Sequence, residues 1–266
     1  MGTICVTGSA SGMGAATAAR LRDNGHRVIG VDQRDTDVVA NLSSPEGREA
    51  AIAGVGDTCG GALDGLVTFA GLGPVPGRSG ALLTSVNYFG SVAVLAGLRP
   101  LLASGTDAAA VAIASNSTTC QPGIPQDLVD ACVAGDEPHA RELGEAVGSI
   151  NAYPATKTAI CRFVRRNAPT DDWIGSGIRL NAIAPGLIDT PLVAEGMADP
   201  EMKPLLEGFP IPVGRPGKPD EIAILVDYLL SPLAGFFCGS VVLCDGGTEA
   251  LLRPDDWPVT WELPTA

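Results

Sequence analysis

Short apolar runs alternate along the chain with segments whose apolar residues recur at helical spacing. The apolar runs predict strands at residues 4–6, 27–31, 65–69, 109–114, 178–183 and 239–244. The helical pattern predicts helices at residues 14–24, 49–55, 82–98, 155–166 and 221–230. Because the two kinds of segment alternate and the strands are apolar throughout, we expect an α/β fold. The expected form is a single-domain, Rossmann-type, doubly wound parallel sheet of about seven strands with helices on both faces.

Two long segments do not fit this alternation. Residues 116–150 are polar, with Pro and a helical charge pattern, and residues 187–219 are rich in Pro and Gly. Long excursions from a compact domain are usually lids or binding loops. We therefore expect an insertion at 116–150 and a lid over a binding site at 187–219, within one domain that spans residues 1–266. The tail, 253–266, is rich in Trp and Pro, and we expect it either to wrap the surface or a partner subunit or to be a loose end.

Composition narrows the classes of partner. The formal net charge of −13 repels nucleic-acid phosphates and anionic lipid, so we expect neither nucleic acid nor a membrane as a partner. No apolar run is expected to span a bilayer, and the N-terminus has no export signal. The seven Cys are scattered without a CxxC pair, which is typical of buried, reduced thiols in a cytoplasmic protein. His26 and His139 lie far from each other and from any Cys cluster, so we expect no metal site.

A glycine-rich segment, Thr7 to Gly14, lies between the first expected strand and the first expected helix. Glycines here let the chain turn tightly, let its backbone approach a pyrophosphate and let the helix pack close to the sheet. The helix N-terminus adds unpaired N–H groups and a partial positive charge. We expect this turn to hold the phosphates of a dinucleotide through Gly8, Ser11, Gly12, Met13 and Gly14. The spacing is Gly-x3-Gly-x-Gly rather than GxGxxG, and a purely structural turn is the alternative.

Asp32 ends the second expected strand, the place where a carboxylate accepts hydrogen bonds from the adenosine-ribose hydroxyls. The same charge repels a 2′-phosphate, so we expect NAD rather than NADP as the cofactor. Arg34 argues in the other direction, because a nearby arginine can hold that phosphate. We give Asp32 more weight because its charge lies against the ribose itself; a solvated acid at a strand end is the alternative.

Tyr153 and Lys157 are four residues apart, which places them on one face of the expected helix. A free phenol has a pKa of about 10, too high for a base near neutrality. A positive charge about 4 Å away, at an effective dielectric of about 20, is worth roughly 4 kcal/mol. At about 1.4 kcal/mol per unit, that lowers the pKa by something like three units. We therefore expect Lys157, with the positive charge of a nicotinamide, to make Tyr153 an acid/base catalyst. An exposed helical pair is the alternative.

Taken together, these features resemble the short-chain dehydrogenase/reductase family along nearly the whole chain. The matching positions, in family order, are Thr7-Gly8-x-x-x-Gly12-x-Gly14, Asp32, Ala70-Gly71, Asn87, Ser115, Tyr153-x-x-x-Lys157, Pro185-Gly186 and Asp245-Gly246-Gly247. Within the family, the chain is most similar to the bacterial 3α-hydroxysteroid dehydrogenase/carbonyl reductases. That similarity rests on residues 30–35, 64–67, 70–74 and 85–90 and on the long gap between Ser115 and Tyr153.

The resemblance implies roles for individual residues of a single NAD-binding catalytic domain. Tyr153 would pass a proton to or from the substrate oxygen, and Ser115 would hydrogen-bond that oxygen as in an oxyanion hole. Lys157 would tune Tyr153 and hold the nicotinamide ribose. Asn87 would bind a water that links Lys157 to solvent; bridging within a helix is its structural alternative. Ser117 is the second candidate for the serine, and the nicotinamide carboxamide would be bound by Pro185, Gly186, Ile188 and Thr190.

On the adenosine side the chain departs from the family pattern. The usual Asn-Asn-Ala-Gly is replaced by Thr68, Phe69, Ala70 and Gly71, and an Asp that touches adenine is replaced by the pair Asn41-Leu42. The backbone turn at Ala70-Gly71 can survive the first change. We expect the Asn41 amide to accept the hydrogen bond in place of the Asp, so neither change touches the chemical step.

The expected activity is interconversion of a secondary alcohol and a ketone with NAD(H). An apolar stripe in the expected lid suits a bulky hydrophobic ketone, and the resemblance implies a hydroxysteroid or another cyclic carbonyl compound. The stripe consists of Leu192, Val193, Met197, Met202, Leu205, Leu206 and Phe209. The resemblance also implies a homodimer rather than a tetramer, formed through the last expected helix and strand. An isomerase or dehydratase on the same scaffold, and a non-catalytic dinucleotide-binding regulatory protein, are the alternative functions.

Overall fold

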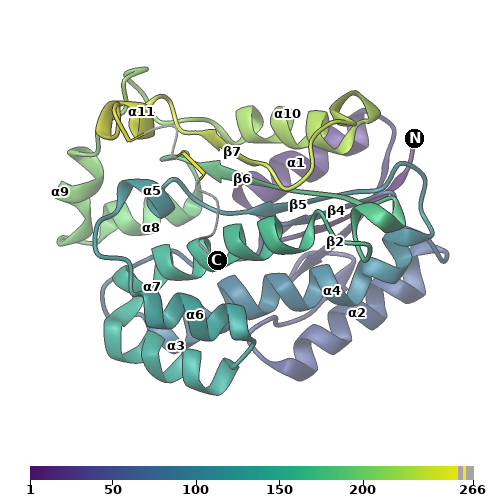
Figure 1. The fold of residues 1–266 in the computed structure, drawn as a ribbon, viewed down its shortest axis with the longest axis horizontal. Helices are drawn as coiled ribbons and strands as arrows, with labels where there is room; N and C mark the ends of the chain where they lie inside the picture. The colour runs from purple at the N-terminus through teal and green to yellow at the C-terminus, as the bar shows by residue number, and fades with distance from the viewer. Residues whose placement is uncertain (257–259, 262–266) are drawn as a thin grey trace.

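One parallel sheet organises the fold, as Figure 1 shows in a computed structural model that describes residues 1–256 and 260–261. The strand order is β3-β2-β1-β4-β5-β6-β7, and all six pairings are parallel. The strands are β1 (Thr3–Thr7), β2 (Arg27–Asp32), β3 (Val38–Val39), β4 (Gly65–Thr68), β5 (Ala109–Ile113), β6 (Arg179–Pro185) and β7 (Val241–Cys244). The predicted fold class is confirmed, and β3 is a strand that the sequence pattern did not indicate.

Helices cover both faces of the sheet because every strand of the interior is apolar on both sides. On one face lie α1 (Gly12–Asp23) and α10 (Pro219–Leu230), which pack against each other. On the other lie α2 (Pro45–Cys59), α4 (Ser91–Ala103) and α7 (Glu137–Asn167). Beyond this second face lies a further layer with α3 (Gly80–Thr84), which leads into the π-helix η1 (Ser85–Gly90), and α6 (Gln126–Ala134).

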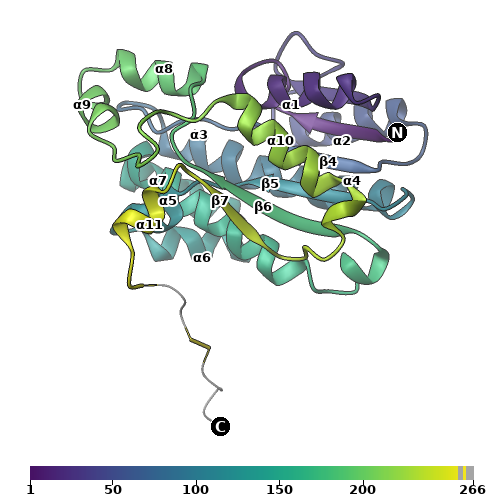
Figure 2. The same ribbon diagram turned by 90° about the horizontal axis from the view of Figure 1, so that it is seen from above.

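The connection order places a crevice at one edge of the sheet. From β1 the chain goes to β2 on one side, and β4 then pairs with β1 on the other. At such a switch point the loops that leave the carboxyl ends of the strands diverge, and ligands bind between them. Figure 2 shows α8 (Pro191–Ala198) and α9 (Met202–Glu207) at this same edge, within the segment predicted to be a lid.

Several helices begin earlier than the sequence pattern predicted. The helix expected at 49–55 begins at Pro45, where the Ser44 hydroxyl accepts a hydrogen bond from the Gly47 N–H. The helix expected at 155–166 is the last part of α7, whose backbone breaks at Gly148 with φ 73°. The helix expected at 82–98 runs through α3, η1 and α4. Local capping chemistry, rather than apolar spacing, sets these starts.

The two predicted excursions contain helices of their own. The insertion 116–150 holds α5 (Ser117–Cys120), α6 and the first part of α7, and α6 packs on α7.

Shorter elements are η2 (Ile174–Ser176), η3 (Pro232–Ala234) and α11 (Thr248–Leu252). Most of the tail predicted for 253–266 lies outside the described residues; at its start Arg253 pairs with Glu249 of α11.

One helical stretch bears on the expectation that no apolar run spans a bilayer. The continuous helical stretch Gly80–Ala103 is, by length and composition, apolar enough to cross a bilayer. In the structure two-thirds of its apolar 18-residue window is buried inside the protein, and Leu83, Leu95 and Leu98 are fully covered. Burial in the core accounts for its apolar character.

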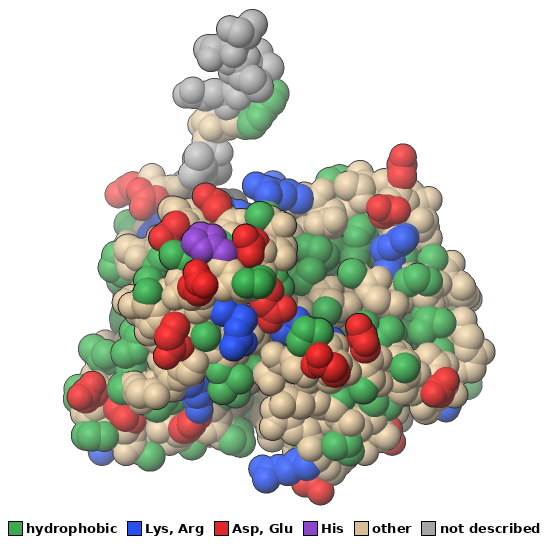
Figure 3. Space-filling view, turned by 90° about the horizontal axis from the view of Figure 1, so that it is seen from below, with side chains coloured by type: hydrophobic (Ala, Val, Ile, Leu, Met, Phe, Trp, Pro, Cys, Tyr) green, Lys and Arg blue, Asp and Glu red, His purple; other side chains and the backbone are tan. Residues whose placement is uncertain are grey.

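The outer layer of helices presents a mixed, mainly acidic surface. Figure 3 shows the molecule from below, on the side of the second helical layer, with acidic and basic side chains interspersed. Among the described residues no continuous basic patch is seen on this face. This distribution agrees with the net charge of −13.

Candidate active site

A cavity of about 760 Å³ opens at the carboxyl edge of the sheet. Its walls come from the loops after β1, β2, β4, β5 and β6 and from α8 and α9. All but two of the predicted site residues line it: Gly8, Ser11, Gly12, Met13, Gly14, Asp32, Leu42, Ala70, Gly71, Ser115, Tyr153, Lys157, Pro185, Gly186, Ile188 and Thr190. The exceptions are Asn41 and Asn87. Residues spread over 183 positions of the chain are thus brought to one place by the parallel sheet.

The glycine turn is shaped for close backbone approach. A Cβ on Gly8 would lie 2.7 Å from the Ala70 nitrogen, and one on Gly14 would lie 2.0 Å from the Gly8 oxygen. Gly8 and Gly12 also have φ of 69° and 53°, which L side chains rarely adopt. Because helix α1 begins at Gly12, its first N–H groups have no partner within the helix and face the cavity wall. This turn fits an anionic group of the size of a pyrophosphate.

The Asp32 carboxylate is held at the end of β2 by backbone donors. Its Oδ2 accepts a hydrogen bond from the Ala10 N–H at 3.0 Å, and its Oδ1 accepts one from the Gln33 N–H at 2.7 Å. Arg34 also lines the cavity; its side chain is 87% exposed and lies 3.9 Å from Asp35, which partly counters its charge. The arrangement favours a ribose with free hydroxyls over one with a 2′-phosphate.

On the adenosine side, Asn41 is not part of the cavity wall, and its hydrogen bond to adenine stays a prediction. Its amide oxygen accepts a hydrogen bond from the Ser43 N–H at 3.1 Å, in a turn that directs it away from the cavity, and the residue does not line the cavity. The wall there is formed by Ala40 and Leu42, both buried.

Ser115, Tyr153 and Lys157 converge at the centre of the cavity. Ser115 follows β5, and Tyr153 and Lys157 lie one turn apart on α7, beyond the break at Gly148. The Lys157 Nζ donates a hydrogen bond to the Ile113 oxygen at 2.9 Å and lies 5.8 Å from the centroid of the Tyr153 ring. The three groups therefore have the mutual placement that the sequence predicted.

Pro154 lies inside this helix and cannot donate to the carbonyl four residues earlier. That carbonyl, of Ile150, accepts a hydrogen bond from the Gln121 side chain at 3.2 Å instead. A residue of the insertion thus satisfies the backbone beside Tyr153.

Burial shifts the pKa values of both Tyr153 and Lys157. Burial raises the pKa of Tyr153, and the hydrogen bond with Ser115 lowers it only in part. Burial lowers the pKa of Lys157 to about 8. Among the chain's own residues, burial of the phenol outweighs the other influences on its pKa. The expectation that Lys157, with the positive charge of a nicotinamide, makes Tyr153 an acid/base catalyst stays a prediction.

Asn87 holds the backbone of the neighbouring loop. Its Oδ1 accepts a hydrogen bond from the Leu72 N–H at 2.7 Å, and its Nδ2 donates to the Leu72 oxygen at 3.0 Å. The side chain is fully buried in η1 and does not line the cavity. The side chain thus bridges η1 and the loop after β4, and the role of Asn87 in binding a water that links Lys157 to solvent stays a prediction.

The choice between the two serines is settled by position. Ser115 lines the cavity, and its Oγ accepts a hydrogen bond from the Ser117 N–H at 3.2 Å. The Ser117 hydroxyl is buried without a hydrogen-bond partner and lies outside the cavity. Ser115 is the serine that can reach a substrate.

The segment predicted to be a lid supplies an apolar wall of the cavity. Five of the seven residues predicted for it line the cavity: Leu192, Val193, Met202, Leu206 and Phe209. Met197 and Leu205 were predicted wrongly, since they are 36% and 63% exposed and point away. Sequence reasoning missed the facing wall, residues 72–75 of the loop after β4, although its Leu-Gly-Pro-Val composition marks an apolar turn.

An ion pair joins these two walls. Arg78, in the loop after β4, donates to Glu195 of α8 at 2.5 Å and to the Gly73 oxygen at 2.6 Å. Glu195 lines the cavity and is 47% exposed, so the pair lies at the solvent side of the cleft. The lid is therefore connected to the opposite wall.

Comparison with known proteins shows the family to which the chain belongs. It is 40% identical to the 3-alpha-hydroxysteroid dehydrogenase/carbonyl reductase of Comamonas testosteroni, over 96% of this chain and 99% of that protein. This chain belongs to the short-chain dehydrogenase/reductase family. A family model described as enoyl-(acyl carrier protein) reductase matches residues 142–249. The chain is also 31% identical to cis-4-hydroxycyclohexanecarboxylate dehydrogenase of Sinomonas cyclohexanicum, over 92% of this chain and 96% of that one.

A solved structure of the family is similar over the whole fold. The 3-alpha-hydroxysteroid dehydrogenase from Pseudomonas sp. B-0831, complexed with NADH, superposes with a TM-score of 0.92. The two sequences are 45% identical over 96% of this chain and 100% of that one.

Proposed function

We propose that this chain is an NAD(H)-dependent oxidoreductase that interconverts secondary alcohols and ketones. The observation that carries the proposal is the convergence of Ser115, Tyr153 and Lys157 in the same cavity as the glycine turn. A phenol, a hydroxyl and an ammonium group beside a dinucleotide site form the donor set that carbonyl reduction needs.

The residues that would hold NAD follow the cavity from end to end. Gly8, Gly12 and the start of α1 would hold the pyrophosphate, Asp32 the adenosine ribose, and Leu42 one side of the adenine. Pro185, Gly186, Ile188 and Thr190, in and after the carboxyl end of β6, also line the cavity and would bind the nicotinamide half. The NADH bound by the similar enzyme from Pseudomonas sp. B-0831 supports this assignment.

The chain's own residues supply the proton chemistry. When bound, the nicotinamide supplies the hydride for reduction of a carbonyl and accepts it in the reverse direction. Ser115 donates a hydrogen bond to the substrate oxygen as negative charge develops there. Because burial keeps the Tyr153 phenol protonated, Tyr153 is placed to donate the proton to that oxygen. Lys157, fixed by Ile113, holds its ammonium over the tyrosine ring and favours the phenolate left behind.

The substrate that suits the cavity is a bulky, hydrophobic ketone or alcohol, such as a hydroxysteroid or another cyclic carbonyl compound. The apolar walls from α8, α9 and residues 72–75 support this class. The names of the similar enzymes from Comamonas testosteroni and Sinomonas cyclohexanicum, which act on a hydroxysteroid and on a cyclohexane derivative, support it as well.

The assembly that we propose is a homodimer through α10 and β7. In support, β7 pairs only with β6 among the residues that the structure describes. Apolar side chains are exposed along this face: Ile224, Tyr228 and Leu243. The cytoplasmic location stays a prediction from the sequence.

The direct test mixes the protein with NAD and a panel of secondary alcohols, including cyclic and steroid alcohols, and follows NADH absorbance. Net NADH formation supports the proposal. Cofactor binding without turnover across the panel favours a regulatory protein, and isomerised or dehydrated product without net NADH favours the isomerase or dehydratase.

The variant Tyr153→Phe tests the assigned acid. It removes one hydroxyl from a buried site, so we expect NADH binding to be retained and turnover to fall by about 10²- to 10⁴-fold. Phe163→Tyr, on the same helix and outside the cavity, is the control for a changed aromatic residue. Near-normal turnover in Tyr153→Phe would refute the assignment.

A further inference from the structure

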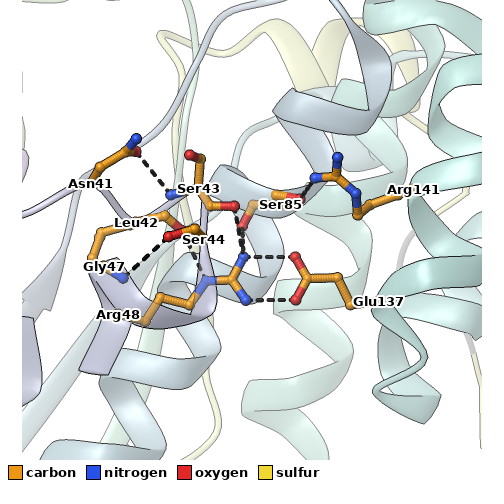
Figure 4. A network of polar contacts seen from close by, with 9 residues as sticks. All are labelled: Asn41, Leu42, Ser43, Ser44, Gly47, Arg48, Ser85, Glu137 and Arg141. Carbon is orange, nitrogen blue, oxygen red and sulfur yellow. Dashed lines mark hydrogen bonds and ion pairs between the residues drawn. The ribbon is translucent and has the colours of Figure 1, made fainter. Parts of the chain in front are cut away.

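A buried arginine lies behind the loop that carries Leu42. Arg48 of α2 is 6% exposed, and its Nε donates a hydrogen bond to the Leu42 oxygen at 2.9 Å. One of its terminal nitrogens also donates to the Ser43 oxygen at 3.4 Å. Figure 4 shows the guanidinium inserted between this loop and the helices beside it. Arg48 therefore fixes the backbone of two consecutive residues at the adenosine end of the cavity.

The countercharge comes from the insertion. Glu137, the first residue of α7, accepts two hydrogen bonds from the Arg48 guanidinium, at 2.6 and 2.7 Å. Burial alone raises the pKa of Glu137, but Arg48 and the charge of Arg141 outweigh it and hold the pKa below its ordinary value. Two parallel charge-assisted hydrogen bonds fix the direction of the guanidinium as well as its charge.

The same guanidinium contacts the π-helix on its other side. Arg48 donates to the Ser85 oxygen at 3.2 Å and lies 5.9 Å from the centroid of the Phe89 ring. The Ser85 hydroxyl in turn accepts a hydrogen bond from Arg141 of the insertion. Leu42 packs against this helix too, since a Cβ on Gly90 would lie 3.1 Å from the Leu42 Cβ. The position of Leu42 is thus set from α2, from η1 and, through Arg48, from the insertion.

We propose that Glu137 is a positioning residue for the cofactor: through Arg48 it holds Leu42 against the adenosine half of the dinucleotide. The inference rests on the proposed use of NAD(H) and extends it to a residue that lies outside the cavity. The insertion then contributes to cofactor binding as well as to the fold, because the affinity for the adenosine half depends on Glu137, the first residue of α7.

The test compares two ligands that differ only by the adenosine half. NADH and reduced nicotinamide mononucleotide are titrated into wild-type protein, Glu137→Gln and the matched control Glu142→Gln, whose side chain is 81% exposed on the same helix. We expect Glu137→Gln to weaken NADH binding about tenfold, which corresponds to about 1.4 kcal/mol, and to leave the mononucleotide unchanged. The control is expected to bind both ligands as the wild type does.

A second variant guards against simple misfolding. Replacement of a buried ion pair by apolar side chains of similar volume is often neutral for stability. The double variant Arg48→Met with Glu137→Leu is therefore expected to fold, to lose the hydrogen bonds to Leu42 and Ser43, and to bind NADH about tenfold more weakly.

Three outcomes overturn the inference. Unchanged NADH affinity in both variants shows that Leu42 needs no such support, while the proposed function stands. An equal loss for both ligands shows a general structural role rather than one at the adenosine end. A wild-type protein that binds no NADH removes the proposed cofactor, and the inference with it.

Discussion

Lys157 is kept in the site at a cost to folding. Burial lowers its pKa from 10.5 to about 8. A shift of about 2.5 units corresponds to roughly 3 kcal/mol that opposes folding where the lysine is charged in both states. The hydrogen bond to Ile113 offsets part of this cost, because the buried carbonyl needs a donor. A charged side chain whose burial destabilises the folded state and that lies beside Tyr153 is characteristic of an active site.

The pH dependence of that cost gives a prediction for Lys157→Met. Between pH 8 and about 10.5 the unfolded lysine still binds its proton while the folded one has lost it, so wild-type stability rises with pH. The free energy of unfolding of the wild type should therefore increase relative to that of the variant, by about 2 to 3 kcal/mol over this window. Urea denaturation at pH 8 and pH 10 measures it. Lys203→Met, at a position 53% exposed, should show no such trend. If the difference in free energy of unfolding between the wild type and Lys157→Met is the same at pH 8 and pH 10, the assigned burial cost is contradicted.

Asp32 is expected to set the choice between NAD and NADP. Asp32→Ala removes an acceptor that Ala10 and Gln33 hold in place, together with its repulsion of a 2′-phosphate. A hydrogen bond to a charged group is worth about 1.5 to 3 kcal/mol, so the ratio of kcat/KM for NAD over NADP should fall by at least about tenfold. Asp57→Ala, an exposed acid on α2, controls for the change in net charge. A wild-type protein that already prefers NADP would show the ribose site to be wrongly assigned.

Among the elements, α8 is linked to the facing wall of the cleft by Arg78 and Glu195. A half-exposed pair contributes at most about 1 kcal/mol, about a fivefold change in the population of a closed lid. Glu195→Gln should therefore raise KM for a bulky ketone by up to about fivefold in low salt, with kcat little reduced. Molar salt should bring the wild type to the same KM because it screens the pair.

The control for this prediction lies on the adjacent lid helix. Glu207→Gln removes an exposed charge that pairs with Lys203 on α9 and does not line the cavity. It should leave KM unchanged. If the KM of Glu195→Gln responds to salt as strongly as that of the wild type, the ion pair does not restrain the lid.

At the level of elements the sequence predicted the strands better than the helices. Buried strands of a parallel sheet are continuous apolar runs, and all six predicted strands are present. The helices of this chain are rich in Ala and Gly, so apolar spacing alone did not locate their starts. The sequence does indicate two of these helix starts, at Ser44-Pro45 and Thr190-Pro191. In both places a residue whose hydroxyl caps the helix is followed by Pro.

The site was predictable where the backbone alone decides the geometry. Gly8, Gly14 and the four-residue spacing of Tyr153 and Lys157 need only a turn and a helix, and the structure brings them together. Asn41 and Asn87 were not predictable, because each amide binds a backbone group whose position depends on the folded loops. The effect of burial on the pKa of Tyr153 was not predictable for a related reason: the burial of the phenol is a property of the assembled cavity.

At the scale of the whole molecule, the negative net charge opposes assembly of two copies. Two copies with a net charge of −13 each repel one another, so a dimer must gain enough from apolar contact to overcome that repulsion. Salt screens the repulsion and leaves the apolar contact intact. Dimerisation should therefore strengthen as salt is raised, the opposite of what an interface built on ion pairs would show.

Ile224→Glu tests the proposed dimer face on α10. Ile224 is 51% exposed, and a carboxylate there would be desolvated in the interface and would face the partner's equivalent charge across a two-fold axis. We expect a monomer by light scattering at concentrations where the wild type is a dimer. Leu205→Glu on α9 adds the same charge at an apolar position that is 63% exposed, so it should stay dimeric. Because both variants have the same net charge, a monomer in Ile224→Glu alone assigns the contact to α10, whereas dissociation of both assigns it to the overall charge.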